Sequence, residues 1–285
     1  MKFLFFSDST HRKNINALKK YNLDMDIVEN AEQLQSTNVW NYNVVISPAK
    51  PVNAFQFKNI KFIFGPHFST FPTQKITGIL ELPNVTYIQP SPWTVATWKN
   101  FEICSKLNIE CLPFGVDTDT FNESKPITER KKVFVYLKHR DPNEFLFLKH
   151  YFLLKNIEYK IFDYNIQYNE KEYIDYLQEA KYGIWIGCHE SQGFALEEAL
   201  SCNVPLFVWN VKSMKQEHEC GHPDVPATSI PYWDSRCGEF FYDVDDFQLK
   251  FKEFLSKLEQ YKPRDYILEN LSIDVCKNKL LDLCA

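Results

Sequence analysis

The stretch that decides the fold reads Gly183-Ile-Trp-Ile-Gly187-Cys-His-Glu190-Ser-Gln-Gly193-Phe-Ala-Leu-Glu-Glu198-Ala-Leu-Ser-Cys-Asn203-Val-Pro205-Leu-Phe-Val208. An apolar run ends near Gly187, a polar loop carries Glu190, and helical spacing begins near Gly193. A second apolar run follows Pro205. This order predicts a strand, a loop, a helix and a second strand, which is the repeating unit of a parallel α/β sheet.

Similar apolar runs recur along the chain, each about the length of a buried strand. They are Lys2–Phe6, Asn43–Ser47, Lys61–Phe64, Val85–Gln89 and Glu110–Phe114, then Val133–Leu137, Tyr159–Phe162, Gly183–Ile186 and Val204–Trp209. Helical spacing lies between many of them, at Arg12–Tyr21, Trp93–Leu107, Glu144–Lys155, Lys171–Ala180, Phe194–Ser201 and Phe247–Gln260. The predicted fold class is α/β, with two Rossmann-like domains joined near Gly115–Lys132.

Composition narrows the class of protein. The chain has 285 residues, of which 45% are hydrophobic and 24% charged, as in an ordinary soluble globular protein of two domains or one large one. Lys and Arg number 32 against 37 Asp and Glu, so nucleic acid is not expected as a partner. We expect no secretory signal, no transmembrane segment and a cytoplasmic location, in which the eight cysteines are reduced thiols.

The commonest nucleotide motifs of parallel sheets are missing from the sequence. No G-x-G-x-x-G follows a predicted strand, and no P-loop is present among only eight glycines. Dehydrogenase and P-loop NTPase functions are therefore not expected.

Two carboxylates fall where ligands of open α/β sheets bind, outside the carboxyl ends of strands. Glu190 follows the predicted strand directly, and Glu198 lies about one turn into the helix, so both can face one crevice. Glu197 is rotated roughly 100° away from Glu198 and is not expected in the site.

The start of the same helix is suited to a phosphate. The amides of Gly193, Phe194 and Ala195 lack partners within the helix and lie at the positive end of its dipole. Carboxylates beside a phosphate seat match a ligand with hydroxyls on both sides of a diphosphate, which is the layout of a nucleotide-sugar.

This segment resembles the signature of the retaining GT-B glycosyltransferases of family four. That signature is a Glu, seven residues and a second Glu with Gly-Phe between them, followed by an Ala and a strand opened by Pro, as at Glu190–Pro205. Leu112–Phe121 resembles the interdomain segment of the family, and Val133–Arg140 resembles its diphosphate-binding strand. The first domain matches loosely, since Ser7–His11 stands in place of a glycine-rich turn.

The resemblance implies a GT-B architecture in which two Rossmann-like domains with parallel sheets face a central cleft. Residues 1–115 would form the acceptor side and residues 116–265 the donor side. Residues 266–285 would form a C-terminal helix that packs back on the first domain, which the apolar stripe Ile267, Leu271, Val275 and Leu280 suits.

The resemblance also implies roles for single residues. Glu190 would contact the donor sugar as a catalytic residue, Glu198 would bind the ribose, and Lys138 with Arg140 would hold the diphosphate. His67 would lie near the donor sugar as a second catalytic residue. The implied reaction moves a sugar from a nucleotide-sugar, a UDP- or GDP-sugar, to a hydroxyl of a glycan or glycoconjugate with retention, using no metal and no cofactor.

Other interpretations of these residues remain open at the level of sequence. The glutamate pair could be solvated surface charge, the basic pair a solvated loop, and His67 a structural hydrogen-bonding residue. His218-Glu-Cys220-Gly-His222 offers three metal ligands with no obvious fourth, and structural zinc needs four, so no metal site is expected. A binding module without activity and a nucleotide-sugar epimerase are the rival functions.

Overall fold

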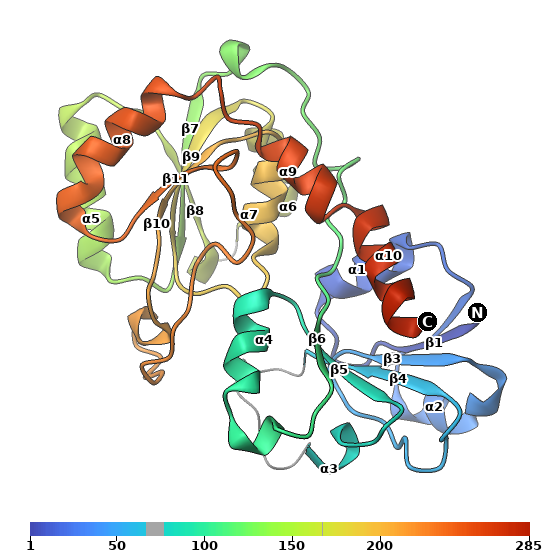
Figure 1. The fold of residues 1–285 in the computed structure, drawn as a ribbon. Helices are drawn as coiled ribbons and strands as arrows, with labels where there is room; N and C mark the ends of the chain where they lie inside the picture. The colour runs from blue at the N-terminus through green and yellow to red at the C-terminus, as the bar shows by residue number, and fades with distance from the viewer. Residues whose placement is uncertain (67–76, 167) are drawn as a thin grey trace. The chain divides into compact units, whose positions relative to one another are not determined.

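A computed structural model of the chain describes residues 1–66, 77–166 and 168–285. They form two compact units, the first from Met1–Gly115 with Ile273–Ala285 and the second from Val116–Ser272. Each unit is built on one sheet in which all the paired strands run parallel (Figure 1). The α/β class and the two parallel-sheet domains predicted from the sequence are therefore confirmed.

The sheet of the first unit has the order β2-β1-β3-β4-β5-β6. Its strands are β1 (Phe3–Phe6), β2 (Met25–Val28), β3 (Val44–Ser47), β4 (Lys61–Phe64), β5 (Val85–Gln89) and β6 (Ile109–Cys111). Its helices are α1 (Arg12–Lys20), α2 (Ala31–Ser36), α3 (Thr77–Leu80), α4 (Pro92–Lys99) and, from the end of the chain, α10 (Ile273–Cys284).

The sheet of the second unit has the order β11-β10-β9-β7-β8. Its strands are β7 (Lys132–Lys138), β8 (Lys160–Asp163), β9 (Ala180–Gly187), β10 (Leu206–Trp209) and β11 (Gly238–Phe241). Its helices are α5 (Pro142–Leu154), α6 (Glu170–Leu177), α7 (Phe194–Ser201), α8 (Phe247–Ser256) and α9 (Pro263–Asn270).

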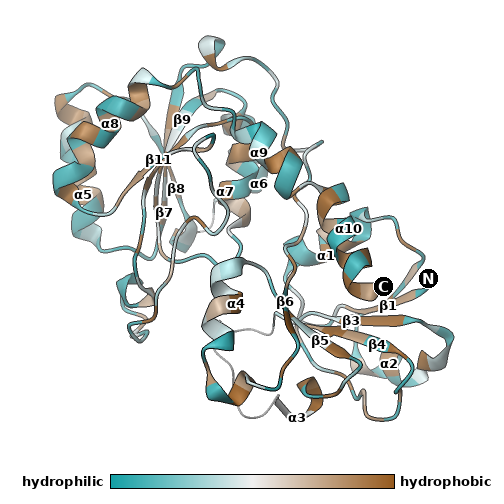
Figure 2. Cartoon of the chain, in the orientation of Figure 1, coloured by the Kyte–Doolittle hydropathy of each residue, from teal (hydrophilic) through white to brown (hydrophobic). Residues whose placement is uncertain are grey.

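Both sheets are apolar because helices cover their faces. Figure 2 shows strands in brown within both units, while several helices carry teal and brown sides. In the second unit α5 and α8 lie on one side of the sheet and α6, α7 and α9 on the other (Figure 1). Phe152 of α5 and Phe251 of α8 pack with Ile184 and Phe207 of the strands in one buried cluster. None of the helices within the described residues has the length and apolar character needed to cross a bilayer.

Two strands, β2 and β11, were not predicted from the sequence, and one predicted helix is divided into two. β2 and β11 are edge strands that include exposed or half-exposed positions such as Asp26 and Glu239, so their apolar runs are interrupted. The segment 266–285, expected as one helix, forms the end of α9 in the second unit and α10 in the first, where α10 packs beside α1. The division falls at Leu271, whose carbonyl accepts a hydrogen bond from the Val116 amide at 2.8 Å.

A buried arginine ties the start of the second unit to the end of α7. The Arg130 side chain donates from Nε to the Lys125 carbonyl at 2.8 Å and from one terminal nitrogen to the Cys202 carbonyl at 2.9 Å. Its other terminal nitrogen lies 3.3 Å from the Glu123 carboxylate. Because Arg130 is 1% exposed, these partners take the place of water around the charge.

We expect Arg130→Ala to destabilise the second unit by about 2–4 kcal/mol, because buried carbonyl acceptors lose their donor. Lys131→Ala is the matched control, since Lys131 is exposed and its replacement should change stability by less than about 0.5 kcal/mol. The urea midpoints of both variants measure the difference. Equal midpoints would show that the Arg130 contacts contribute nothing to stability.

Candidate active site

In the sheet of the second unit, two neighbouring strands, β7 and β9, lead to connections that run in opposite directions. β7 and β9 are neighbours, and Lys138 at the end of β7 is in register with Gly187 at the end of β9. The chain leaving β7 continues to β8 on one side, whereas the chain leaving β9 continues to β10 on the other. Ligands of open α/β sheets bind at such a switch point, because the diverging loops leave a crevice there.

Lys138 and Glu190 meet at this switch point. The Lys138 ammonium donates to both oxygens of the Glu190 carboxylate, at 2.8 and 2.9 Å, and lies 4.7 Å from the centre of the Tyr164 ring. The two side chains are 18% and 12% exposed. Burial by itself would lower the pKa of Lys138, but the Glu190 carboxylate outweighs it and holds that pKa above its ordinary value. Lys138 is therefore a positive charge at the carboxyl end of β7.

The loop that carries Glu190 is held from two sides. The Glu190 amide donates to the Thr228 carbonyl at 3.0 Å, and the Ser229 hydroxyl donates to the Gly187 carbonyl at 3.0 Å. The Asn210 side-chain oxygen in turn accepts hydrogen bonds from the Ser229 amide and the Thr228 hydroxyl. The loops that follow β9 and β10 are thus joined, and they place Glu190 beside Lys138.

Helix α7 begins beside the same carboxylate. Its N-cap residue is Gly193, which has a φ of +90° and no side chain to cap the first turn. A Cβ atom at Gly193 would lie only 3.4 Å from the Glu190 Cβ atom. The first-turn residues Phe194 and Ala195 therefore lie at the positive end of the helix, close to Glu190 in the chain.

Glu198 and Glu197 occupy different environments on α7. Glu198 is 5% exposed, and burial together with the carboxylates of Glu198 and Glu190 raises the pKa of Tyr168, so both glutamates lie near that phenol. Glu197 is fully buried, and burial raises its pKa well above the ordinary value while Gln192 donates to its Oε2 atom at 3.1 Å. Glu197 is thus a buried group held by Gln192, whereas Glu198 is the glutamate of α7 whose charge acts on Tyr168 together with that of Glu190.

Arg140 does not share the surroundings of Lys138. Its guanidinium donates to both oxygens of Glu144 at 2.7 Å, and to the Gly187 and Trp209 carbonyls at 3.0 and 2.8 Å. The residue is 9% exposed, and four of its five N–H groups are engaged in these bonds. These contacts give Arg140 a structural role across the ends of β9 and β10. The diphosphate contact that the family resemblance implies for Arg140 stays a prediction.

Two residues near Lys138 and Glu190 were not predicted from the sequence, and one predicted site residue is not among the described residues. His67 falls outside the described residues, so its role near the donor sugar stays a prediction. Tyr164 and Tyr168 follow β8. The Tyr164 ring lies beside the Lys138 ammonium, and the Tyr168 ring contacts the Tyr136 ring of β7. Their position directly after the predicted strand Tyr159–Phe162 is the sequence signal that could have indicated them.

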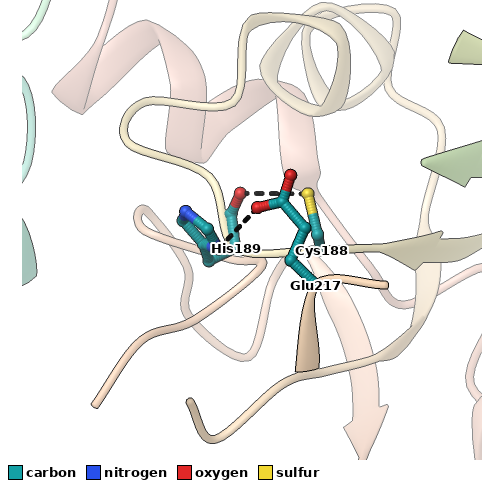
Figure 3. A group of neighbouring side chains, drawn as sticks. All are labelled: Cys188, His189 and Glu217. Carbon is teal, nitrogen blue, oxygen red and sulfur yellow. Dashed lines mark hydrogen bonds and ion pairs between the residues drawn. The ribbon is translucent and has the colours of Figure 1, made fainter. Parts of the chain in front are cut away.

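A second group of side chains at this sheet edge could hold a metal ion. The ligand atoms of Cys188, His189 and Glu217 lie within 4.8 Å of one another, and so do those of Glu217, Cys220 and His222. Figure 3 shows the first three side chains converging from two loops. Burial lowers the pKa of His189 to about 4, although the Glu217 carboxylate opposes this shift. At neutral pH His189 is therefore uncharged.

Comparison with known proteins identifies the fold through structure alone. No family model matches the chain, and no curated protein has a significantly similar sequence. Among solved structures, sucrose-phosphate synthase from Thermosynechococcus elongatus is similar with a TM-score of 0.59 at 10% identity, and the match covers 99% of this chain and 98% of that one.

Two further structures carry the word glycosyltransferase or galactosyltransferase in their descriptions. The apo form of the lipopolysaccharide outer core galactosyltransferase WaaB has a TM-score of 0.55 at 13% identity, over 99% of this chain and 98% of that one. WaaG, a glycosyltransferase involved in lipopolysaccharide biosynthesis, has a TM-score of 0.50 at 9% identity, over 99% of each chain. With its two parallel-sheet α/β domains, the chain has the GT-B fold of these glycosyltransferases.

Proposed function

We propose that the protein is a retaining glycosyltransferase that moves a sugar from a nucleotide-sugar to a hydroxyl of a glycan or glycoconjugate. The donor would be a UDP- or GDP-sugar. The observation that carries the proposal is the Lys138–Glu190 ion pair, which lies at the switch point of the second sheet. The GT-B fold adds support by analogy, because many proteins with this architecture transfer sugars.

The donor would bind to the second unit with its three parts spread along these residues. Glu198 would hold the ribose, and Glu190 would hold hydroxyls of the sugar. The diphosphate between them would lie against the Lys138 ammonium and the amides of Phe194 and Ala195 at the start of α7. A bound diphosphate would then take over part of the contact that Lys138 makes with Glu190, freeing the carboxylate for the sugar.

Transfer breaks the bond between the anomeric carbon and a diphosphate oxygen, and negative charge develops on that oxygen. Lys138 would stabilise this charge, because its raised pKa keeps the ammonium protonated throughout the reaction. The helix start would act in the same direction. With retention, the acceptor attacks from the face that the diphosphate leaves, and the hydroxyl proton passes to the leaving phosphate.

No metal or cofactor is assigned to the transfer step in this proposal. In metal-dependent phosphate chemistry, a cation neutralises the leaving phosphate. Here a buried lysine and a helix start would supply that positive potential.

The function predicts which ligands stabilise the chain. A panel of nucleotide-sugars, tested without Mg²⁺ or Mn²⁺, should contain a UDP- or GDP-sugar that raises the melting temperature by several degrees at about 100 times its Kd, since such binding adds about 2.7 kcal/mol. The same donor should give turnover with added glycan acceptors. Dependence of binding or turnover on Mg²⁺ or Mn²⁺ would contradict the metal-free transfer step, and nucleotide release without any acceptor product would favour an epimerase.

Lys138→Met should lower affinity for the nucleoside diphosphate by roughly 10- to 100-fold, because a charge-assisted contact is worth about 1.5–3 kcal/mol. Affinity for the nucleoside without phosphates should not change. Lys132→Met is the control, since Lys132 lies at the opposite end of the same strand. The double variant Lys138→Met/Glu190→Gln removes both charges, and continued loss of affinity there would exclude simple repulsion by the unpaired Glu190. Calorimetric titration measures all four proteins.

Glu198→Ala and Glu190→Ala should separate nucleotide binding from turnover. Loss of the ribose contact in Glu198→Ala should weaken nucleoside diphosphate binding by about 1.5–3 kcal/mol. Glu190→Ala should leave that binding nearly intact and depress turnover, because the sugar is no longer held in a reactive position. Calorimetry beside turnover assays distinguishes the two variants. The reverse result would reverse the placement of the donor, and no effect of either variant would make the pair a surface coincidence.

A further inference from the structure

Helix α7 begins at a residue that restrains its own backbone very little. The N-cap residue Gly193 has a φ of +90° and makes no side-chain hydrogen bond to the first turn. Glycine populates many backbone conformations at similar cost, and the first-turn amides of a helix have no partners within it. The direction of the Phe194 and Ala195 amides therefore depends on contacts made by neighbouring residues.

Two buried polar side chains meet beside this helix start. The Gln192 side-chain amide donates to the Glu197 Oε2 atom at 3.1 Å, and the Glu197 main-chain amide donates to the Gly193 carbonyl at 3.0 Å. Gln192 is 3% exposed and Glu197 is 0% exposed. Glu197 thus holds two consecutive residues of the helix entry, Gln192 through its side chain and Gly193 through its main chain.

The Glu197 carboxyl is costly to bury at this position. Among the described residues, no hydrogen-bond partner lies at its Oε1 atom. Burial raises the pKa of Glu197 well above its ordinary value, and the carboxylates of Glu198 and Glu190 act in the same direction. Leu196 and Leu200 of the same helix are apolar and fully buried. An apolar side chain would fill the Glu197 position at lower cost, so stability alone does not explain the glutamate.

The first turn of α7 is also held from α6. The hydroxyl of Tyr173, which is 1% exposed, donates to the Ala195 carbonyl at 2.8 Å. Buried hydrogen bonds therefore restrain both the first turn and the residue that precedes Gly193. Such restraint matters where main-chain amides bind a ligand, because amides that are already aligned lose little freedom on binding.

We propose that Gln192 and Glu197 are positioning residues for the phosphate groups of the donor. Their buried hydrogen bond fixes the turn at Gly193 and thereby aligns the Phe194 and Ala195 amides. This role rests on the proposed function, in which those amides hold the diphosphate. Glu197 acts through the helix start and does not itself reach the donor.

The double variant Gln192→Met/Glu197→Leu tests the role, because it replaces both partners by apolar groups of similar size. Its melting temperature should stay within about 2 °C of that of the unchanged chain, or rise. Its affinity for UDP or GDP should fall roughly 3- to 10-fold, as expected when main-chain hydrogen bonds to phosphate lose alignment. Affinity for uridine or guanosine should not change. Calorimetric titration with each of the four ligands measures these effects.

Two further variants separate positioning from stability. Glu197→Gln keeps an acceptor for Gln192 and should bind UDP or GDP like the unchanged chain. Ser201→Ala is the matched control, since Ser201 is a fully buried residue at the other end of α7 whose hydroxyl donates to the Phe121 carbonyl. It should lower the melting temperature without changing affinity. Equal loss of affinity in Ser201→Ala, or equal loss for nucleosides and diphosphates, would overturn the positioning role.

Hydrogen exchange at the amides of residues 193–196, followed without nucleotide, distinguishes this role from the proposed function. Exchange should be faster in the double variant than in the unchanged chain or Ser201→Ala, and Glu197→Gln should restore it. Equal exchange in the double variant and the unchanged chain would overturn the restraint, whatever the ligand. If the unchanged chain bound neither UDP nor GDP, the proposed donor site would be wrong and the alignment with phosphate would fall with it, while exchange would still decide whether Gln192 and Glu197 hold the helix start.

Discussion

The parallel pairing of β7 with β9 is the constraint on which the candidate site depends. It brings the end of β7 at Lys138 level with the end of β9 at Gly187, although the crossovers from these strands leave in opposite directions. The main chain is joined at the same place, because the Cys188 amide donates to the Lys138 carbonyl at 2.9 Å. A different neighbour for β7 would separate Lys138 from Glu190, so the ion pair is a product of sheet order and not of local sequence.

The two basic residues at this sheet edge, Arg140 and Lys138, have different environments. Arg140 is buried and donates hydrogen bonds to Glu144 and to two main-chain carbonyls, so it stabilises the ends of the strands. Lys138 is paired with the Glu190 carboxylate, and its side chain is 18% exposed. An anionic ligand can compete with Glu190 for Lys138, whereas displacing Arg140 would leave several buried groups without partners. The two cations at this edge therefore differ in surroundings: Arg140 joins Glu144 to two strand-end carbonyls, and Lys138 pairs with Glu190.

In the loop after β9, two adjacent residues make different ionic contacts. His189 contacts Glu217, and Glu190 contacts Lys138. Anchoring of the Glu190 amide to Thr228 and of the Gly187 carbonyl to Ser229 stiffens the segment between them.

The sequence by itself determined the inner strands and helix α7, because strands covered on both faces need continuous apolar runs and α7 has a clear start at Gly193. It also placed Glu190 and Glu198 near one helix start, since helical spacing is a local property. It missed β2 and β11, whose exposed edges permit polar residues such as Asp26 and Glu239. Only the tertiary structure distinguished Lys138 from Arg140 and joined Cys188 and His189 to the Glu217 loop. Those contacts depend on which strands are neighbours, and strand order is set by packing across the whole sheet, which no local pattern encodes.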